Sequence, residues 1–190
     1  GQPTWRIEQR AGGGDELVFD RTNKVVLAKG HARLQMPGAG MGGATFLSRP
    51  GSASASLPPP TNQVLEVLCD SYELRTNVAV FRDRVRVSDR LGDQQQGQMT
   101  CGRMTLTFVG TNELQKLVAE QEVVIARADG RFTAARADYT ASDNLLELTG
   151  NPAWQAGSRE GKGDWMRVNP AREELLVQGN ALMKLPAGEV

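Results

Sequence analysis

The feature that most constrains the fold is a pattern of alternating apolar and polar residues that recurs along the chain. It is clearest around Gly150, returns around Gly179 and Gly30, and has weaker copies around Asp83 and Gln121. The residues two and four positions before and after each centre are apolar in all five segments, whereas those directly beside each centre are polar or charged. Because side chains two apart in a strand share a face, each segment is predicted to be a strand of about nine residues with one continuous apolar face.

The centre of each segment predicts a sharp bend in the strand. Glycine tolerates the backbone geometry of a kink or bulge, and a polar neighbour can bond the backbone groups that the bend disturbs. The sequence Gly150-Asn151-Pro152 interrupts two apolar runs in this way. We therefore expect corners at Gly30, Gly150 and Gly179.

Three of these segments follow a second alternating strand and a turn. The turns fall at residues 20–23, 140–143 and 169–172 and are rich in Asn, Asp, Ser and Pro. Each such unit is therefore predicted to be a β-hairpin. Hairpins of similar size stack and bury their apolar faces against their neighbours, which predicts an all-β protein with a single domain over residues 1–190.

Two stretches interrupt the pattern without ending it. Residues 37–60 are rich in Gly, Ser, Ala and Pro, which predicts a flexible loop insert, and residues 90–98 have the composition of a long polar hairpin tip. The alternation resumes in phase after both stretches, so neither is predicted to be a domain boundary.

The charge balance and hydropathy narrow the class of protein. Lysine plus arginine equals aspartate plus glutamate, 22 each, so a general nucleic-acid binder is not expected. No stretch approaches the roughly 20 consecutive apolar residues of a membrane-spanning helix. The first residues have neither the basic nor the apolar region of a signal peptide, so we expect none within this sequence.

Few residues could support catalysis or bind a metal. His31 is the only histidine and takes the same place beside a centre as Asn151, which predicts a structural role at a corner. No Ser/His/Asp arrangement, phosphate-binding glycine loop or metal-ligand spacing is present, so we expect no enzyme activity, metal or cofactor. Cys69 and Cys101 fit either one disulfide or two free thiols, since a bond requires Cα atoms within about 7 Å and the spacing does not decide this.

The motifs resemble a known family. A turn followed by L-x-L-T-G-N-P, a strand, Gly-Asp and M-x-V-N-P is similar to the OstA-like repeat of the lipopolysaccharide transport proteins LptA, LptC and the periplasmic part of LptD. The residues that carry the resemblance are Ala137, Tyr139, Leu146, Leu148, Thr149, Gly150, Asn151, Pro152, Gly163, Asp164, Met166, Val168, Asn169, Pro170, Gly179, Asn180 and Ala181.

The resemblance implies both a fold and a function. The fold is a β-jellyroll of stacked antiparallel hairpins that form two V-shaped sheets and leave both ends open. The function is periplasmic transport of lipopolysaccharide, with the acyl chains of lipid A held between the sheets. The implied partners are lipopolysaccharide and other OstA-like domains, bound by strand-edge pairing in an envelope-spanning bridge. The unpaired strand edges expected at both ends of the array also predict head-to-tail oligomers of this chain.

The best-formed segments supply the candidate lipid-binding wall. Acyl chains need apolar side chains and no catalytic group, and the expected wall consists of Leu146, Leu148, Trp154, Met166, Val168, Leu175, Val177 and Met183. Two other interpretations remain open from the residues themselves. The inward residues could form a dry, closed core, and the protein could be an assembly module that binds other β proteins through its open sheet edges without lipid cargo.

Overall fold

The protein is all-β, as predicted. The structure, a computed structural model, describes residues 1–7, 9–38, 47, 63–110, 113–170, 172 and 174–186, and these ranges contain no α-helix. No membrane-crossing helix is therefore present among them. The strands are β1 Thr4–Ile7, β2 Arg10–Gly13, β3 Glu16–Asp20, β4 Val25–Pro37, β5 Gln63–Leu74, β6 Val78–Leu91, β7 Gln94–Val109, β8 Glu113–Arg127, β9 Gly130–Thr140, β10 Leu145–Thr149, β11 Ala153–Ala156, β12 Arg159–Lys162, β13 Trp165–Asn169, β14 Glu174–Gln178 and β15 Leu182–Lys184.

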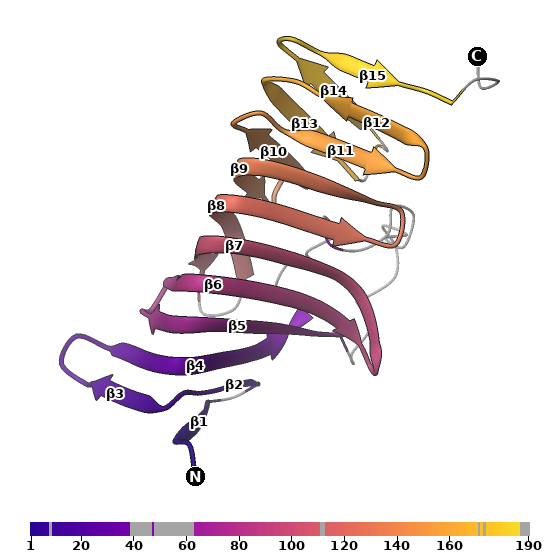
Figure 1. The fold of residues 1–190 in the computed structure, drawn as a ribbon. Helices are drawn as coiled ribbons and strands as arrows, with labels where there is room; N and C mark the ends of the chain where they lie inside the picture. The colour runs from indigo at the N-terminus through magenta and orange to yellow at the C-terminus, as the bar shows by residue number, and fades with distance from the viewer. Residues whose placement is uncertain are drawn as a thin grey trace.

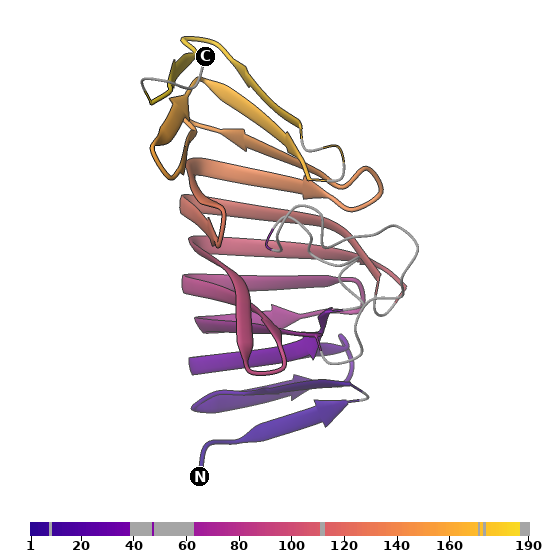
Figure 2. The same cartoon turned by 90° about the vertical axis from the view of Figure 1, so that its right-hand side faces the viewer.

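The strands stack in sequence order into an open antiparallel array that is folded along its length (Figure 1). The long strands β4 to β9 cross the fold line and contribute to both halves, which we call sheet I and sheet II. Sheet I runs β3-β4-β5-β6-β7-β8-β9-β10-β13-β14. Sheet II begins with β1 and β2 and ends with β11, β12 and β15. The two sheets face each other across a V, with the termini at opposite ends of the stack (Figure 2).

The fold line is made by pairs of residues with positive φ. Gly150 and Asn151 have φ of 78° and 56°, and Gly179 and Asn180 have 69° and 45°. The same pairing occurs at Gly30 with His31, at Asp83 with Arg84, and at Gln121 with Glu122. All five centres in the sequence pattern are therefore corners, including the two that have no glycine.

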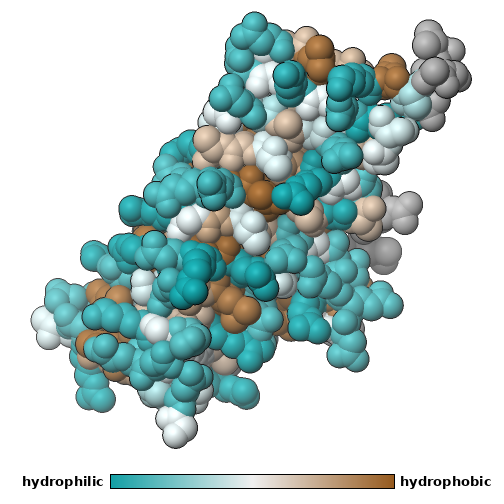
Figure 3. All heavy atoms as spheres, in the orientation of Figure 1, coloured by the Kyte–Doolittle hydropathy of each residue, from teal (hydrophilic) through white to brown (hydrophobic). Residues whose placement is uncertain are grey.

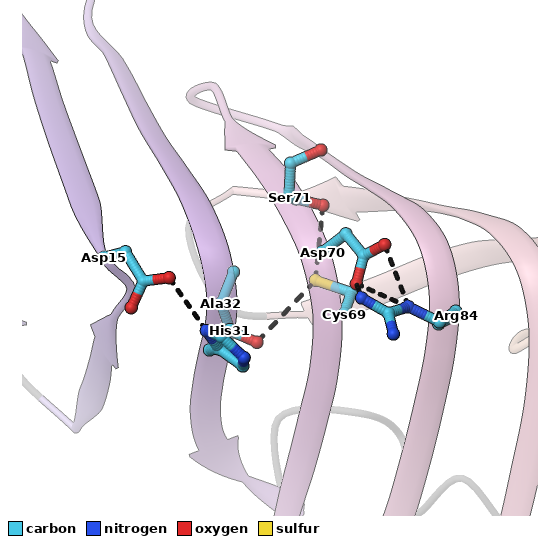
Figure 4. Close-up of polar contacts among 7 residues, drawn as sticks. All are labelled: Asp15, His31, Ala32, Cys69, Asp70, Ser71 and Arg84. Atoms are coloured by element: carbon cyan, nitrogen blue, oxygen red, sulfur yellow. Dashed lines mark hydrogen bonds and ion pairs between the residues drawn. The ribbon is translucent and has the colours of Figure 1, made fainter.

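Side chains on the neighbouring strands stabilise several corners (Figure 4). The Asp15 carboxylate lies 2.8 Å from His31 Nδ1. Arg84 Nε donates to Asp70 at 2.9 Å, and Asn180 Nδ2 donates to Asp164 at 2.9 Å. At these three corners an acidic residue from a neighbouring part of the array thus holds the second corner residue, which explains why that residue is polar.

The alternating apolar positions face the interior of the V. In β4 to β10 most of them are fully buried, as for Ala28, Phe81 and Leu117. In the last strands they are half-buried, and Ala181 and Met183 are exposed. The predicted core is therefore correct up to the last layer, where no further strand of this chain covers the inner face.

Two predictions about local structure need correction. The strands of the central layers are longer than the expected nine residues, with 14 in β6 and 16 in β7. Residues 90–98 form a hairpin tip, but β6 and β7 run through almost all of it and leave only Gly92 and Asp93 as the turn. The strands extend because the polar tip still pairs residue by residue, as between Leu91 and Gln94.

The insert and the cysteines complete the comparison. Most of the predicted loop at 37–60 lies outside the described residues. Leu47, the one described residue between 39 and 62, is fully buried in the core. Cys69 and Cys101 are free and buried. Since β6 lies between their strands, their Cα atoms are about two strand spacings, or about 10 Å, apart, which is too far for a disulfide.

The corner geometry predicts unequal costs for two glycine substitutions. A Cβ at Gly150, where φ is 78°, would overlap with the Cβ of Ala135, whereas a Cβ at Gly110, where φ is 62°, would meet nothing within 4 Å. Left-handed backbone costs a non-glycine residue about 1–2 kcal/mol, and overpacking adds about 1–3 kcal/mol. We expect Gly150→Ala to lower the free energy of unfolding by about 3 kcal/mol and Gly110→Ala by about 1 kcal/mol, measured by urea denaturation. Equal losses in the two variants would contradict the overpacking contribution at Gly150. Adding Ala135→Gly should restore part of the lost stability in the Gly150→Ala protein but not in the Gly110→Ala protein.

The buried thiols predict a clear chemical behaviour. Burial, with the Asp70 charge adding to it at Cys69, raises the pKa of both Cys69 and Cys101 to about 12. Because the thiolate is the reactive form, both side chains should react slowly with a thiol reagent in the folded protein. Unfolding without reductant should release two thiols per chain in the same assay, and a count near zero would mean that a disulfide exists.

Candidate functional site

The predicted wall residues lie in three rows that cross neighbouring strands near the C-terminal end of the array. In sheet I, Leu146 on β10 pairs with Val168 on β13, which pairs with Leu175 on β14. The second row, two residues nearer the corner, consists of Leu148, Met166 and Val177. In sheet II, Trp154 pairs with Gly161, which pairs with Met183. The structure therefore brings together all eight residues at one end of the V.

The rows become more exposed toward the C-terminal edge. Leu146, Leu148 and Met166 are fully buried, and Leu148 is only 1% exposed. Leu175, Val177 and Trp154 are half-buried and pack on the core. Met183 is 58% exposed. The first group is thus part of the closed core, and Leu175, Val177, Trp154 and Met183 form the more exposed surface. Val168 is buried at 6% exposure but lines the cavity described next.

A cavity of about 470 Å³ opens between the two sheets at this end. Trp154, Val168 and Leu175 from the predicted set contribute apolar surface, and Phe132 adds an aromatic ring that pairs across strands with Trp154. The volume lies within the range of about 300–1,000 Å³ that is usual for small-molecule sites. The lining is formed by Arg127, Asp129, Gly130, Phe132, Trp154, Gln155, Ala156, Arg159, Val168, Asn169, Pro170, Glu174 and Leu175.

Four charged residues also line this cavity, namely Arg127, Asp129, Arg159 and Glu174, and the first two neutralise each other. Arg127 Nε donates to Asp129 at 2.9 Å, and its second nitrogen donates to the other carboxylate oxygen at 3.0 Å. The guanidinium also lies 5.2 Å from the centre of the Phe132 ring, and only 7% of the Arg127 side chain is exposed. This bidentate pair leaves the Arg127 and Asp129 charges satisfied by each other, beside the apolar part of the lining.

In the N-terminal part of the V, side chains fill the space between the sheets. Leu34, Leu65, Val87 and Met99 fill the space between the sheets and are almost fully buried. Leu47 is buried with them, and its carbonyl oxygen lies against Gly97, where a Cβ would overlap with it. The interpretation of a dry, closed core therefore fits this part of the molecule, whereas the C-terminal end is open.

Sequence reasoning missed a pair of tryptophan–glycine contacts. Trp5 pairs across strands with Gly12, and Trp154 pairs in the same way with Gly161; a Cβ on either glycine would run into the indole ring. The signal was present in the sequence, because residues 150–186 parallel 1–37 position by position, from Gly-Asn-Pro-Ala-Trp against Gly-Gln-Pro-Thr-Trp onward. The alternation pattern alone does not detect it, since these partners are several residues apart.

The described residues contain no group of three or more His, Cys, Asp or Glu side chains placed to hold a metal ion. His31 lies at its corner, 81% exposed and beside Asp15, as the sequence predicts. The thiols of Cys69 and Cys101 are buried at the fold line, and their raised pKa leaves them protonated at neutral pH. Among the described residues, the cavity between the sheets therefore remains the candidate ligand site.

The comparisons with known proteins agree with this geometry. Residues 70–184, more than half of the chain, match the family described as "LptA/(LptD N-terminal domain) LPS transport protein". No curated protein matches the chain significantly. Among solved structures, the chain is similar to LptH, described as the LptA homologous periplasmic component of the lipopolysaccharide transport device from Pseudomonas aeruginosa.

The similarity to LptH concerns the fold. The TM-score is 0.55 at 15% sequence identity, and the match covers 64% of this chain and 94% of LptH. The all-β array folded into two facing sheets is thus the architecture of that protein, as the sequence motifs implied. Taken with the match over residues 70–184, this shows that the chain belongs to the LptA/LptD N-terminal domain family of lipopolysaccharide transport proteins.

Proposed function

We propose that residues 1–190 act as one periplasmic jellyroll unit that binds lipopolysaccharide by holding acyl chains of lipid A between its two sheets, without enzyme activity and without a cofactor. The observation that carries this proposal is the cavity of about 470 Å³ between sheets I and II in the C-terminal layers, where Trp154, Val168 and Leu175 supply apolar lining. Acyl carbons that move from water into this cavity would pack against Trp154, Val168 and Leu175. Burial of apolar surface is favourable by about 25 cal/mol per Å².

The eight predicted residues have different roles in this proposal. Leu146, Leu148 and Met166 form the floor and support the wall from behind. Trp154, Val168 and Leu175 contact the acyl chain in the cavity. Val177 and Met183 lie toward the open edge, where the acyl chain of the lipid would enter or leave.

The protein also has two open edges that suit assembly. Within the described residues, β3 and β1 pair on one side only at the N-terminal end, and β14 and β15 do so at the C-terminal end. Unpaired strand edges invite pairing with another chain. Apolar surface is visible toward both ends of the array in Figure 3. Val18 and Phe19 on β3 and Leu176 on β14 are exposed at these ends.

The internal pairing of β10 with β13 suggests a register for head-to-tail contact between copies. Leu176 stands three residues before its corner as Glu147 does, and Val18 stands three residues after Asp15 as Arg167 does after Asp164. Since Glu147 pairs with Arg167, Leu176 of one copy should face Val18 of the next on the outer surface. These two side chains are 38% and 44% exposed in the single chain.

One observation supports the alternative function, an assembly module without lipid cargo. The interior of β4 to β8 is closed, so only the C-terminal layers offer space to an acyl chain. The lipid-binding experiment that follows decides between the two functions, because an assembly module needs the edges and not the cavity.

The lipid prediction compares two neighbouring residues on β14. Leu175 faces the cavity and Leu176 faces the outside. A charge at Leu175 would lose about 1.5–3 kcal/mol of apolar burial and would be costly to desolvate, which is roughly a 10- to 150-fold loss in affinity. We expect Leu175→Asp to weaken binding of a lipid A analogue to this extent, measured by fluorescence titration of dilute protein, while Leu176→Asp leaves it within about threefold.

The choice of Leu175 follows from its partial exposure. Leu148→Asp would place a charge in the closed core and would test folding rather than binding, whereas Val177→Asp is a second, half-buried test of the wall. Arg172→Ala, at an exposed turn, should change nothing. A folded Leu175→Asp protein with unchanged affinity would support the module without lipid cargo.

The assembly prediction uses engineered cysteines in a Cys69→Ser, Cys101→Ser background. A protein with both Val18→Cys and Leu176→Cys should form a ladder of disulfide-linked oligomers at high concentration, because the two residues face each other in the proposed register. Oxidation followed by non-reducing electrophoresis measures this. Leu176→Cys combined with Val64→Cys, on the outer face of β5 away from both edges, is the control, and equal ladders in the two proteins would refute the register.

A further inference from the structure

The two ends of the array are built from the same structural unit. Strands β1 to β4 at the N-terminal end correspond to β11 to β15 at the C-terminal end, with matching corners at Gly30 and Gly179. Asp15 and Asp164 hold those corners in the same way. A contact that one unit makes and the other lacks therefore reflects a neighbouring strand that only one of them has.

In the N-terminal unit the tryptophan has a hydrogen-bond partner on a neighbouring strand. Trp5 Nε1 donates to the Tyr72 hydroxyl at 2.7 Å, over Gly12. Tyr72 is on β5, the strand that follows the unit, and pairs with Ala28 of β4. Burial raises the pKa of Tyr72 to about 12, so its hydroxyl remains neutral and can accept this bond at any physiological pH.

In the C-terminal unit the same indole nitrogen has no partner. Trp154 lies over Gly161 as Trp5 lies over Gly12, yet Trp154 Nε1 is the only buried side-chain nitrogen or oxygen without a hydrogen bond among the described residues. Buried polar groups without a partner are rare in folded proteins because each costs about as much as a lost hydrogen bond.

The internal comparison locates the missing acceptor. Val177 is the counterpart of Ala28, and Ala28 is the residue opposite Tyr72. A strand added to the free edge of β14 as β5 is added to β4 would therefore place its residue opposite Val177 over Gly161, within reach of Trp154 Nε1.

We propose that the C-terminal edge is built to receive an antiparallel strand of another jellyroll protein that presents a tyrosine hydroxyl opposite Val177, which accepts the hydrogen bond of Trp154. The inference rests on the edge pairing in the proposed function and specifies the chemistry of the partner at one of the two edges. It makes the C-terminal edge selective, since a strand without an acceptor at this position leaves the indole nitrogen unpaired.

A second copy of this chain does not supply that acceptor. In the head-to-tail register the residue of β3 that faces Val177 is Leu17, as Met166 faces Leu148 inside the array. Its side chain has no hydrogen-bond acceptor. Pairing between copies is therefore expected to be weaker than pairing with a tyrosine-bearing partner strand, and the partner should displace the copy.

The test uses the β5 sequence as the probe. A synthetic peptide of residues 63–76 with Cys69→Ser is added to the full chain, beside the same peptide with Tyr72→Phe. We expect the tyrosine peptide to bind about tenfold more tightly by titration, the usual scale of one buried neutral hydrogen bond. The preference should disappear in a Trp154→Phe protein and persist in a Trp165→Phe protein.

A second measurement uses the unmodified protein. In a ¹H–¹⁵N spectrum the indole signal of Trp154 should shift with the tyrosine peptide and much less with the phenylalanine peptide, while the Trp5 signal stays in place. Equal affinities and equal shifts for the two peptides would overturn the tyrosine acceptor while leaving edge pairing intact. If neither peptide bound, the proposed pairing of a partner strand with the C-terminal edge would itself be overturned. The lipid titration and the Val18–Leu176 crosslink test the proposed function independently of both results.

Discussion

The fold depends on a two-residue left-handed step that bends a strand without ending it. An ordinary β-strand cannot turn sharply while its neighbours remain paired, yet β4, β6 and β8 do so because two consecutive residues have positive φ. The step costs about 1–2 kcal/mol per non-glycine residue, as at Asp83 and Arg84. Contacts across strands offset part of this cost, such as the ion pair from Arg84 to Asp70.

Once the strands bend at the same level, the remaining architecture follows. The apolar face of one half of each bent strand points at the apolar face of the other half across the V, so the inner residues of the two sheets bury one another. Only at the ends of the array do inner residues lack a covering strand. The cavity, the half-buried Leu175 and the exposed Met183 all occur in the last layers for this reason. The same incompleteness that would be a defect in a closed globular protein leaves a cavity between the sheets and, among the described residues, strand edges that pair on one side only.

The alternation pattern was sufficient to predict the bends, the hairpins and the core, because these depend on local side-chain periodicity. It located the corners at Asp83 and Gln121 without glycine, since polar residues at and beside the centre still interrupt the apolar positions on either side. It could not predict which wall residues are accessible. Leu146 and Leu175 both stand four residues before their corners, and only the number of layers beyond each one distinguishes a closed core from a cavity wall. The tryptophan–glycine contacts were missed because they depend on cross-strand register.

The repeated end units give the array a direction. A stack of equivalent hairpins would offer the same edge chemistry at both ends, and its partners could bind in either order. Here the N-terminal unit satisfies Trp5 internally through Tyr72, whereas the C-terminal unit leaves Trp154 unpaired at a matching position. One hydrogen bond is small against the main-chain pairing of a whole strand, but main-chain bonds do not distinguish one partner strand from another. In a transport array whose modules share one fold, a buried side chain of this kind is a means by which the order of the modules can be encoded.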